Sequence, residues 1–340
     1  MFRQSKAEFA IINSFDSFDG FIFVLNYIRT LGKVCLWTVF FNKDKLTKAC
    51  RKLRLLHYCG GNLYGHKSLD LSLIRGFKRL GIPFSWNKVN KYTKYVILLW
   101  VVNEKDLECI KKIKKKYPDI KIVTAPSACR LGGDYMYKFA ELDFIDYSLV
   151  ASETVKKNLQ DKTDAKYYKK IKAWPSGVIV NDLDEKQKIH NAVLCYYKLV
   201  PQNKKITEYL HNKGISTYVL EYGAYQIEDY YDVLNKVDFV VFIQDIIETQ
   251  GLAIAEAWAK NRPSIIKYNV GGNGCGTCPY LTKKTGMYYK TEKDLFNVID
   301  EYVKDKQKFL RKFSPYKVAK EKFSDEASVK ELIKIFQAKK

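Results

Sequence analysis

The sequence has few acidic residues for its length. Its 340 residues include 59 lysines and arginines but only 37 aspartates and glutamates, so the formal net charge is +22. Such an excess favours an anionic partner, and nucleic acid, an anionic membrane surface and a phosphorylated small substrate are the three candidates. Hydrophobic residues make up 47% and charged residues 28% of the chain, which excludes a disordered, fibrous or polytopic membrane protein.

Several local signals are missing as well. The eight cysteines lack the spacing of a small disulfide-linked domain, which favours a reduced intracellular protein. Residues 1–8 lack the basic, apolar and small-residue succession of a cleaved signal peptide, so secretion is not expected. The sequence contains no Gly-x-Gly-x-x-Gly motif, so a dinucleotide cofactor is not favoured. Cys275 and Cys278 form one Cys-x-x-Cys without a second ligand pair, so we predict neither a metal site nor any other cofactor.

An uninterrupted apolar run long enough to cross a membrane is also absent. Phe18–Phe41 is apolar over more than twenty positions but contains Asn26, Arg29 and Lys33, spaced to lie on one side of a helix. Central Arg and Lys each cost roughly 2.5–3.5 kcal/mol in hydrocarbon, so an amphipathic helix is favoured over a spanning one. The basic run Lys43–Arg54 that follows suits anionic headgroups. The helix either lies on a membrane or packs on the protein itself, and both interpretations stay open.

Apolar strands alternate with amphipathic helices along the rest of the chain, starting with a predicted strand at residues 53–58. This alternation predicts an α/β fold with parallel sheets. The polar stretch Asn181–Lys188 has the composition of a linker. We therefore predict an N-terminal extension (1–50), two Rossmann-like domains (51–180 and 181–310) and C-terminal helices (311–340) that can return to the first domain. Because ligands bind at the carboxyl ends of parallel strands, the site is expected in the cleft between the domains.

The most informative segment contains two glutamates, Glu248 and Glu256, separated by seven residues across a predicted strand-to-helix turn. Thr249, Gln250 and Gly251 open the helix, whose free N–H groups and positive dipole end can bind a phosphate. Glu248 can accept hydrogen bonds from sugar hydroxyls, and Glu256 can reach further into the same cleft. The pattern favours a polyol phosphate ligand, although two glutamates on an ordinary amphipathic helix would have the same spacing.

The segment ETQGLAIAEAWAKNRPSI, from Glu248, resembles the Glu-x7-Glu signature of retaining GT-B glycosyltransferases of family 4. Three further segments resemble family elements in the same order, namely 147–159, 173–178 and 192–205. The resemblance implies two Rossmann-like domains facing a central cleft. It also implies a retaining hexosyltransferase (EC 2.4 class) that moves a sugar from a nucleoside-diphosphate sugar to a glycan or lipid-linked acceptor. The process would be surface polysaccharide or glycoconjugate synthesis, and no metal would be required.

The same resemblance implies roles for individual residues. Glu248 would contact the donor sugar hydroxyls, and Glu256 the nucleoside ribose. Lys198 occupies the usual arginine position, while Lys204 lies one residue beyond the usual lysine position, which Asn203 fills. Both lysines would neutralise the departing diphosphate, because fixed cations stabilise the negative charge that develops there. Plain surface lysines are the alternative.

The first predicted domain offers weaker candidates. Gly60 and Gly61 lie in a turn after the first predicted strand, where backbone amides can face a phosphate of the donor or the acceptor, but a plain tight turn fits equally well. His66, at the start of the following helix, either approaches the acceptor or has a capping or solvent-facing role. The segment 271–279, rich in glycine, is expected to line the donor site.

The sequence departs from the family where many members have a histidine, in the loop after the strand that ends at Thr124. Arg130 and Asp134 are the nearby polar candidates for catalysis. A retaining mechanism in which the leaving phosphate takes the acceptor proton would need no protein base, and this route is favoured.

The expected partners follow from the charge and the resemblance together. They are a nucleotide sugar, a glycan or lipid-linked acceptor and an anionic membrane surface, with the protein cytoplasmic and peripheral at the inner membrane face. The lysines are spread over both halves and no recognised nucleic-acid module is present, so no specific nucleic acid is expected. A basic nucleic-acid-binding protein and a non-catalytic sugar-nucleotide binder remain the alternatives.

Overall fold

The computed structural model describes residues 7–12, 64–86, 88–99, 104–126, 139–183, 189–269 and 277–338. The chain forms two compact units, one of the described residues up to Leu71 with Pro83–Tyr147, the other of Ser72–Ile82 with Ser148 onward. The predicted N-terminal helix, the predicted strand 53–58 and the candidates Gly60, Gly61, Arg130 and Asp134 lie outside the described residues.

The first unit contains parallel strands, and its most N-terminal strand corrects the sequence prediction. β1 (Phe9–Ile12) pairs in parallel with both β2 (Phe84–Trp86) and β3 (Tyr95–Leu98). β3 in turn pairs with β4 (Lys121–Thr124). All four β1 residues are buried. Residues 9–12 therefore belong to a sheet, although the sequence analysis assigned them to an N-terminal extension.

Two more strands complete this sheet. β5 (Tyr147–Val150) pairs in parallel with β6 (Ile171–Ala173), a three-residue strand that the sequence did not predict. The six strands follow the order β2-β1-β3-β4-β5-β6. The helical segments between or before these strands are α3 (Tyr64–Arg79), α4 (Glu104–Lys116), α6 (Glu153–Gln160) and the 3-10 turn η2 (Ala165–Lys170). The Ser152 side chain caps α6 by accepting a hydrogen bond from the Val155 N–H.

The second sheet has five parallel strands in the order β11-β10-β9-β7-β8. Their bounds are β7 (Ala192–Lys198), β8 (Ser216–Glu221), β9 (Phe239–Gln244), β10 (Ser264–Lys267) and β11 (Gly286–Tyr289). Four of them match predicted strands, and β11 was not predicted. Two parallel sheets with alternating helices confirm the predicted α/β class.

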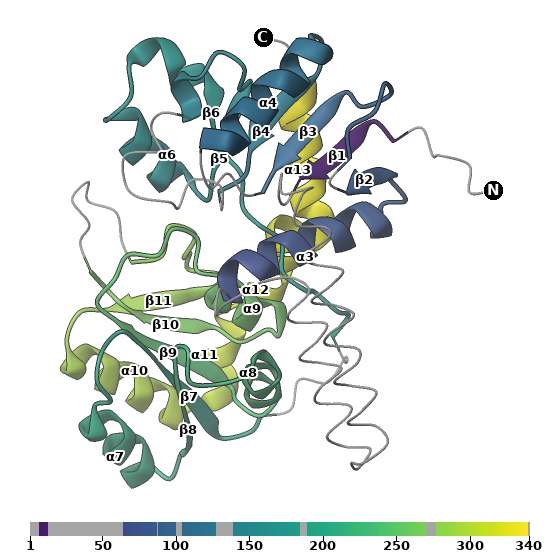
Figure 1. Cartoon of the computed structure of the whole chain (residues 1–340). Coiled ribbons are helices and arrows are strands. Elements are labelled where there is room, and N and C mark those ends of the chain that lie inside the picture. Colours follow the sequence, from purple (N-terminus) through teal and green to yellow (C-terminus); the bar gives the residue numbers. More distant parts are fainter. Residues whose placement is uncertain are drawn as a thin grey trace, which may run out of the picture. The chain divides into compact units, whose positions relative to one another are not determined.

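Helices cover both faces of the five-stranded sheet, and strand alternation assigns each side chain to one face (Figure 1). On one face, Tyr196 and Phe242 pack with Trp258 under α8 (Ile227–Leu234) and α9 (Leu252–Ala259). On the other, Tyr197 and neighbouring strand residues pack under α7 (Lys204–Asn212), α10 (Glu292–Lys304) and α11 (Lys306–Arg311). We call these the α9 face and the α7 face.

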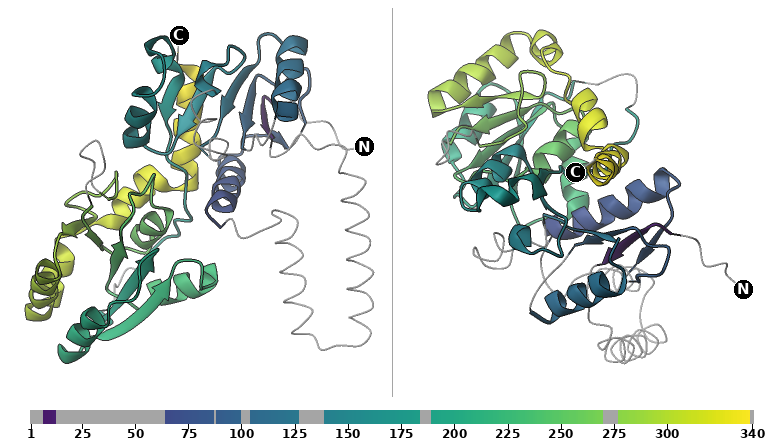
Figure 2. Two further views of the ribbon diagram at one scale, coloured as in Figure 1. Left: turned by 60° about the vertical axis from the view of Figure 1, so that its left-hand side comes forward. Right: turned by 90° about the horizontal axis from the view of Figure 1, so that it is seen from above.

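The C-terminal chain continues from the five-stranded sheet through α12 (Pro315–Val318), the π-helical turn η3 (Ala319–Phe323) and α13 (Asp325–Gln337), drawn in yellow in Figure 2. The Trp174 indole N–H donates to the Ser328 carbonyl over 2.9 Å. Arg75 binds both carboxylate oxygens of buried Asp325, at 2.6 and 3.0 Å. At Gly76 an added Cβ would collide with the Asp325 carbonyl, so only glycine permits this close approach of α3 to α13.

Candidate functional site

The structure brings Lys198 and Glu248 into direct contact at the carboxyl end of the five-stranded sheet. Lys198 is the last residue of β7, and Glu248 lies in the loop after β9. The Lys198 Nζ is 2.7 Å from the Glu248 Oε1, and the two side chains are only 18% and 11% exposed. The same Nζ lies 4.9 Å from the ring centroid of Tyr222, which is 47% exposed. A cation, a carboxylate and an exposed aromatic ring thus lie together at the carboxyl end of the sheet, which is where α/β sheets bind ligands.

Hydrogen bonds fix the loop that carries Glu248. The Glu248 N–H donates to the Thr277 carbonyl over 2.8 Å, and the Asn269 N–H donates to the Thr277 hydroxyl over 2.7 Å. The Asn269 side-chain amide donates to the Gln244 carbonyl over 2.7 Å. Both ends of the Gly-rich segment are therefore tied to the Glu248 loop, while residues 270–276 lie outside the described part of the chain.

The start of α9 agrees with the predicted turn. Gly251 has a φ of 81° and forms the N-cap, and an added Cβ would lie 2.9 Å from the Ile254 Cδ1. The left-handed backbone favours glycine here, whereas the close contact is with the flexible end of the Ile254 side chain, which can move aside. No side chain caps α9, so the N–H groups of its first turn remain available to an anion. Thr249, in the loop before them, is exposed.

Glu256 lies deeper than the sequence suggested. Its side chain is on the buried side of α9 with a relative exposure of 6%, and Tyr231 donates a hydrogen bond to its Oε1 over 3.0 Å. Burial raises the pKa of Glu256 to about 7, while the Tyr231 hydrogen bond and the nearby Arg75 guanidinium oppose the increase. The carboxyl group therefore titrates near neutral pH.

A pair of tyrosines connects the surroundings of the two glutamates. The hydroxyls of Tyr196 and Tyr225 are 2.8 Å apart. Burial raises the pKa of Tyr196, and the nearby Glu248 carboxylate raises it further. Burial also raises the pKa of Tyr225, to about 12, and the Glu256 carboxylate contributes to this increase. Both hydroxyls thus remain protonated at neutral pH and can act as hydrogen-bond donors.

Lys204 lines a cavity whose lining does not include Lys198. It is the exposed first residue of α7, and the cavity, of about 420 Å³, is also lined by Lys205, Lys267 and Asp245. Lys267 and Asp245 follow β-strand positions of the α7 face, whereas Lys198 continues the α9-face series of Leu194 and Tyr196. Because Lys198 is not part of this lining, the role in binding the diphosphate that the resemblance implies for Lys204 stays a prediction.

Gln250, one of the residues expected to open the helix, has a structural role that the sequence did not indicate. Its buried side chain accepts a hydrogen bond from the Ser176 N–H over 2.8 Å and donates one to the Ser176 carbonyl over 2.7 Å. Ser176 lies between β6 and β7, so this amide joins the Glu248 loop to the segment that precedes the second sheet. A glutamine beside the first glutamate was the only signal in the sequence.

We expect Gln250→Met to lower the free energy of unfolding by about 2 kcal/mol, because two buried backbone groups of Ser176 lose their partners. Urea unfolding measures the change. Gln307→Met, the same substitution at an exposed position of α11, is the matched control and should leave stability unchanged. Equal stability of both variants would contradict a structural role for the Gln250 amide.

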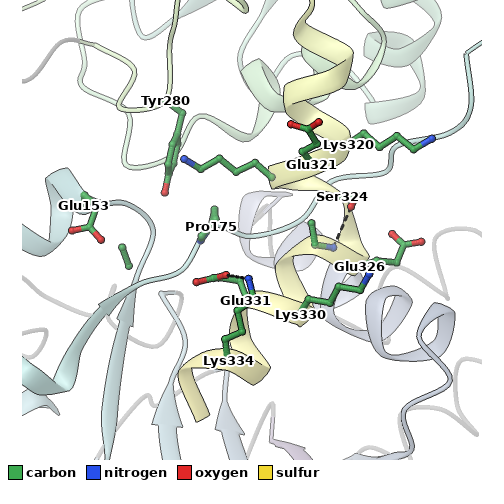
Figure 3. Close-up of a pocket in the computed structure, with 13 residues that line it drawn as sticks. Glu153, Pro175, Tyr280, Lys320, Glu321, Ser324, Glu326, Lys330, Glu331 and Lys334 are labelled. Atoms are coloured by element: carbon green, nitrogen blue, oxygen red, sulfur yellow. Dashed lines mark hydrogen bonds and ion pairs between the residues drawn. The ribbon is translucent and has the colours of Figure 1, made fainter. Parts of the chain in front are cut away.

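A second cavity, of about 490 Å³, lies among α6, the segment after β6, Tyr280, η3 and α13 (Figure 3). Its lining includes four lysines (Lys320, Lys322, Lys330, Lys334) and four glutamates (Glu153, Glu321, Glu326, Glu331). Lys334 forms an ion pair with Glu331 over 3.1 Å, and the Lys322 Nζ lies 4.4 Å from the Tyr280 ring centroid. The lining therefore has no net charge that would favour an anion.

Within the described ranges, no three or more His, Cys, Asp or Glu side chains cluster in a way that could hold a metal ion. None of the helices in those ranges is both long and apolar enough to cross a membrane. Cys278, the described member of the Cys-x-x-Cys, is a buried free thiol, and burial raises its pKa to about 12. Its partner Cys275 lies outside the described residues.

No protein-family model and no curated protein matches the sequence. Among solved structures, a glycosyltransferase from Rickettsia africae ESF-5 is similar over 98% of each chain, with 12% identity and a TM-score of 0.52. TarM of S. aureus has 14% identity and a TM-score of 0.48 over 79% of this chain. HepE of Anabaena, in complex with UDP and glucose, has 11% identity and a TM-score of 0.47 over 77% of this chain and 88% of its own.

The likeness to the Rickettsia structure, together with the two parallel sheets, defines the fold of this chain as GT-B. The chain spans 58% of the length of TarM.

Proposed function

We propose that this chain is a retaining glycosyltransferase that transfers a hexose from a nucleoside-diphosphate sugar to a glycan or lipid-linked acceptor. The process would be the synthesis of a surface polysaccharide or glycoconjugate. The observation that supports this function best is the Lys198–Glu248 ion pair at the carboxyl end of the five-stranded sheet, next to the uncapped start of α9. An ammonium, a carboxylate and free helix N–H groups match the diphosphate and the hydroxyls of such a donor.

Each of these groups has a physical role in the transfer. Cleavage of the bond between the sugar and the diphosphate develops negative charge on the leaving oxygen, which the Lys198 ammonium would stabilise. The Glu248 carboxylate would accept hydrogen bonds from sugar hydroxyls. In the described structure the two side chains neutralise each other, so the donor would replace their mutual contact with its phosphate and its hydroxyls. Glu256 would accept from the nucleoside ribose.

During transfer the acceptor hydroxyl must lose its proton to a base. In the proposed retaining route the leaving phosphate takes it, and no protein base is required. Asp134 is the candidate base of the opposing hypothesis. If the leaving phosphate takes the proton, Asp134→Ala should transfer sugar at the rate of the wild type. Loss of transfer with unchanged donor binding would contradict this route.

We also propose that the protein is cytoplasmic and binds peripherally to the inner membrane face. The net charge of +22 and the basic run after the predicted N-terminal helix support this location. Co-sedimentation of the full chain should be stronger with anionic than with neutral vesicles and should weaken as salt increases. Equal binding to both kinds of vesicle would contradict the electrostatic part of the proposal.

The experiment that tests the activity is a panel of nucleotide sugars, incubated with the purified chain and read by mass spectrometry. We expect binding or slow hydrolysis of at least one donor and loss of both in Glu248→Ala. NMR spectroscopy of the transfer product should show the anomeric configuration of the donor. Binding without transfer to any glycan or lipid-linked acceptor would favour a non-catalytic sugar-nucleotide binder. Absence of all binding, with salt-sensitive binding to DNA or RNA, would favour the nucleic-acid alternative.

A further inference from the structure

Gln244, the last residue of β9, carries a buried amide without partners. The residue has no exposed surface, and neither its Nε2 nor its Oε1 has a hydrogen-bond partner. Among the buried side chains that the structure describes, it is the only one whose amide lacks a partner at both ends. Buried polar groups are almost always hydrogen-bonded, because an unmade bond costs the full desolvation of the group. A buried amide in this state needs a hydrogen-bonding partner, which an ordered water or a bound ligand can supply.

The position of Gln244 identifies the site to which this ligand belongs. Gln244 stands directly opposite Lys198 in the parallel register of β7 and β9. Strand alternation places both side chains on the α9 face, where Phe242 and Tyr196 precede them. Neighbouring strands lie about 4.8 Å apart, so the Gln244 side chain begins beside that of Lys198. The Lys198–Glu248 pair is itself only slightly exposed, and Gln244 has no exposed surface.

The chemistry of an amide distinguishes between the parts of a nucleotide sugar. The Gln244 Nε2 can only donate and its Oε1 can only accept. Phosphate oxygens accept but do not donate, so a diphosphate would leave the Oε1 without a partner. The hydroxyls of the donor sugar and of the ribose, and the edge of the base, all donate and accept and can satisfy both ends of one amide. Because Gln244 lies beside Lys198, whose partner Glu248 would hold the donor sugar hydroxyls, the sugar is the part of the donor favoured here.

We propose that Gln244 recognises hydroxyl groups of the donor sugar and thereby contributes to donor specificity. This inference rests on the proposed glycosyltransferase function and deepens it. A donor that draws Lys198 to its phosphate and Glu248 to its hydroxyls opens the ion pair and reaches the amide beside it. The unsatisfied amide then gains its hydrogen bonds only when a correctly hydroxylated sugar is bound, which is the condition for strong discrimination against analogues that lack a hydroxyl.

Gln244→Met tests the inference, because methionine has a similar shape and no hydrogen-bonding requirement. Without donor, the midpoint of urea unfolding should be equal to or above that of the wild type, since the substitution removes an unsatisfied buried group. With the donor sugar identified by the panel, kcat/KM should fall about 10- to 100-fold, while affinity for the free nucleoside diphosphate should stay unchanged. Gln307→Met, on exposed α11, is the matched control for the change of side chain.

A series of deoxy analogues of the same donor supplies the decisive measurement. In the wild type, removal of the hydroxyl that Gln244 contacts should lower kcat/KM about 10- to 100-fold, and in Gln244→Met the same removal should have almost no effect. An equal penalty in both chains would overturn the inference, as would a strong loss of stability or of nucleoside diphosphate affinity in the variant. Failure of the wild type to bind any nucleotide sugar would instead overturn the proposed function, and the inference with it.

Discussion

Replacement of Lys198 by methionine is expected to lower kcat/KM for sugar transfer by about 10²- to 10³-fold, the usual effect of removing one fixed group that stabilises developing charge. The loss should appear mainly in kcat, because the charge on the leaving diphosphate is greatest in the transition state. Steady-state kinetics with the donor found by the panel measures the change. An exposed lysine of α11, in Lys308→Met, is the matched control and should leave kcat/KM unchanged.

The same substitution removes the only cation that an ion pair gives to Glu248 within the described residues. A largely buried carboxylate without its partner destabilises the fold, by up to about 3 kcal/mol. The double variant Lys198→Met/Glu248→Gln separates the two effects, since it should recover most of the stability but none of the activity. Full activity of Lys198→Met would exclude this lysine from the transfer.

A pH-dependent change in stability is expected at Glu256. Its folded-state pKa of about 7 lies above the ordinary value of 4.5 because of burial, so the folded chain holds this proton more tightly than the unfolded chain. The stabilising contribution of the proton is complete below pH 4.5 and is lost as the pH rises through 7. A shift of this size corresponds to about 3 kcal/mol between pH 4 and pH 8.

Glu256→Gln measures this effect, because glutamine is neutral at every pH and can still accept the Tyr231 hydrogen bond. Its free energy of unfolding should equal that of the wild type near pH 4 and exceed it by up to about 3 kcal/mol at pH 8. Glu208→Gln, at an exposed position of α7, is the matched control and should show no such divergence. A constant difference between wild type and Glu256→Gln across the pH range would contradict the raised pKa.

Local patterns in the sequence predicted most elements of the second sheet. β7, β9 and α9 appear within one or two residues of their expected bounds, because buried parallel strands are continuous apolar runs and each is followed by a helix. β1 was missed because its four residues precede a much longer apolar segment that obscured them. β6 has Lys172 at its centre and β11 begins with Gly286, and both residue types are depleted in strands, so neither segment was recognised.

Residues of the candidate site were predictable to different degrees. Glu248, Glu256 and Lys198 followed from the resemblance, but the contact between Lys198 and Glu248 spans fifty residues and depends on β7 lying beside β9. The cavity that Lys204 lines is built from the start of α7 and the ends of β9 and β10, which only the tertiary structure brings together. For Gln244, the sequence shows only a glutamine at the end of an apolar strand. Its complete burial, which the sequence does not show, is what distinguishes this residue.

The sequence by itself determined the α/β class, the positive charge and the two glutamates at a strand-to-helix turn, because periodicity, charge and turn chemistry act within a few residues. Only the tertiary structure decided which groups meet and in what state. It joined Lys198 to Glu248, enclosed Glu256 against Tyr231 so that its proton is held near neutral pH, and left the Gln244 amide without a partner. Ion pairing and desolvation depend on neighbours that are distant in the chain, so no local pattern contains them.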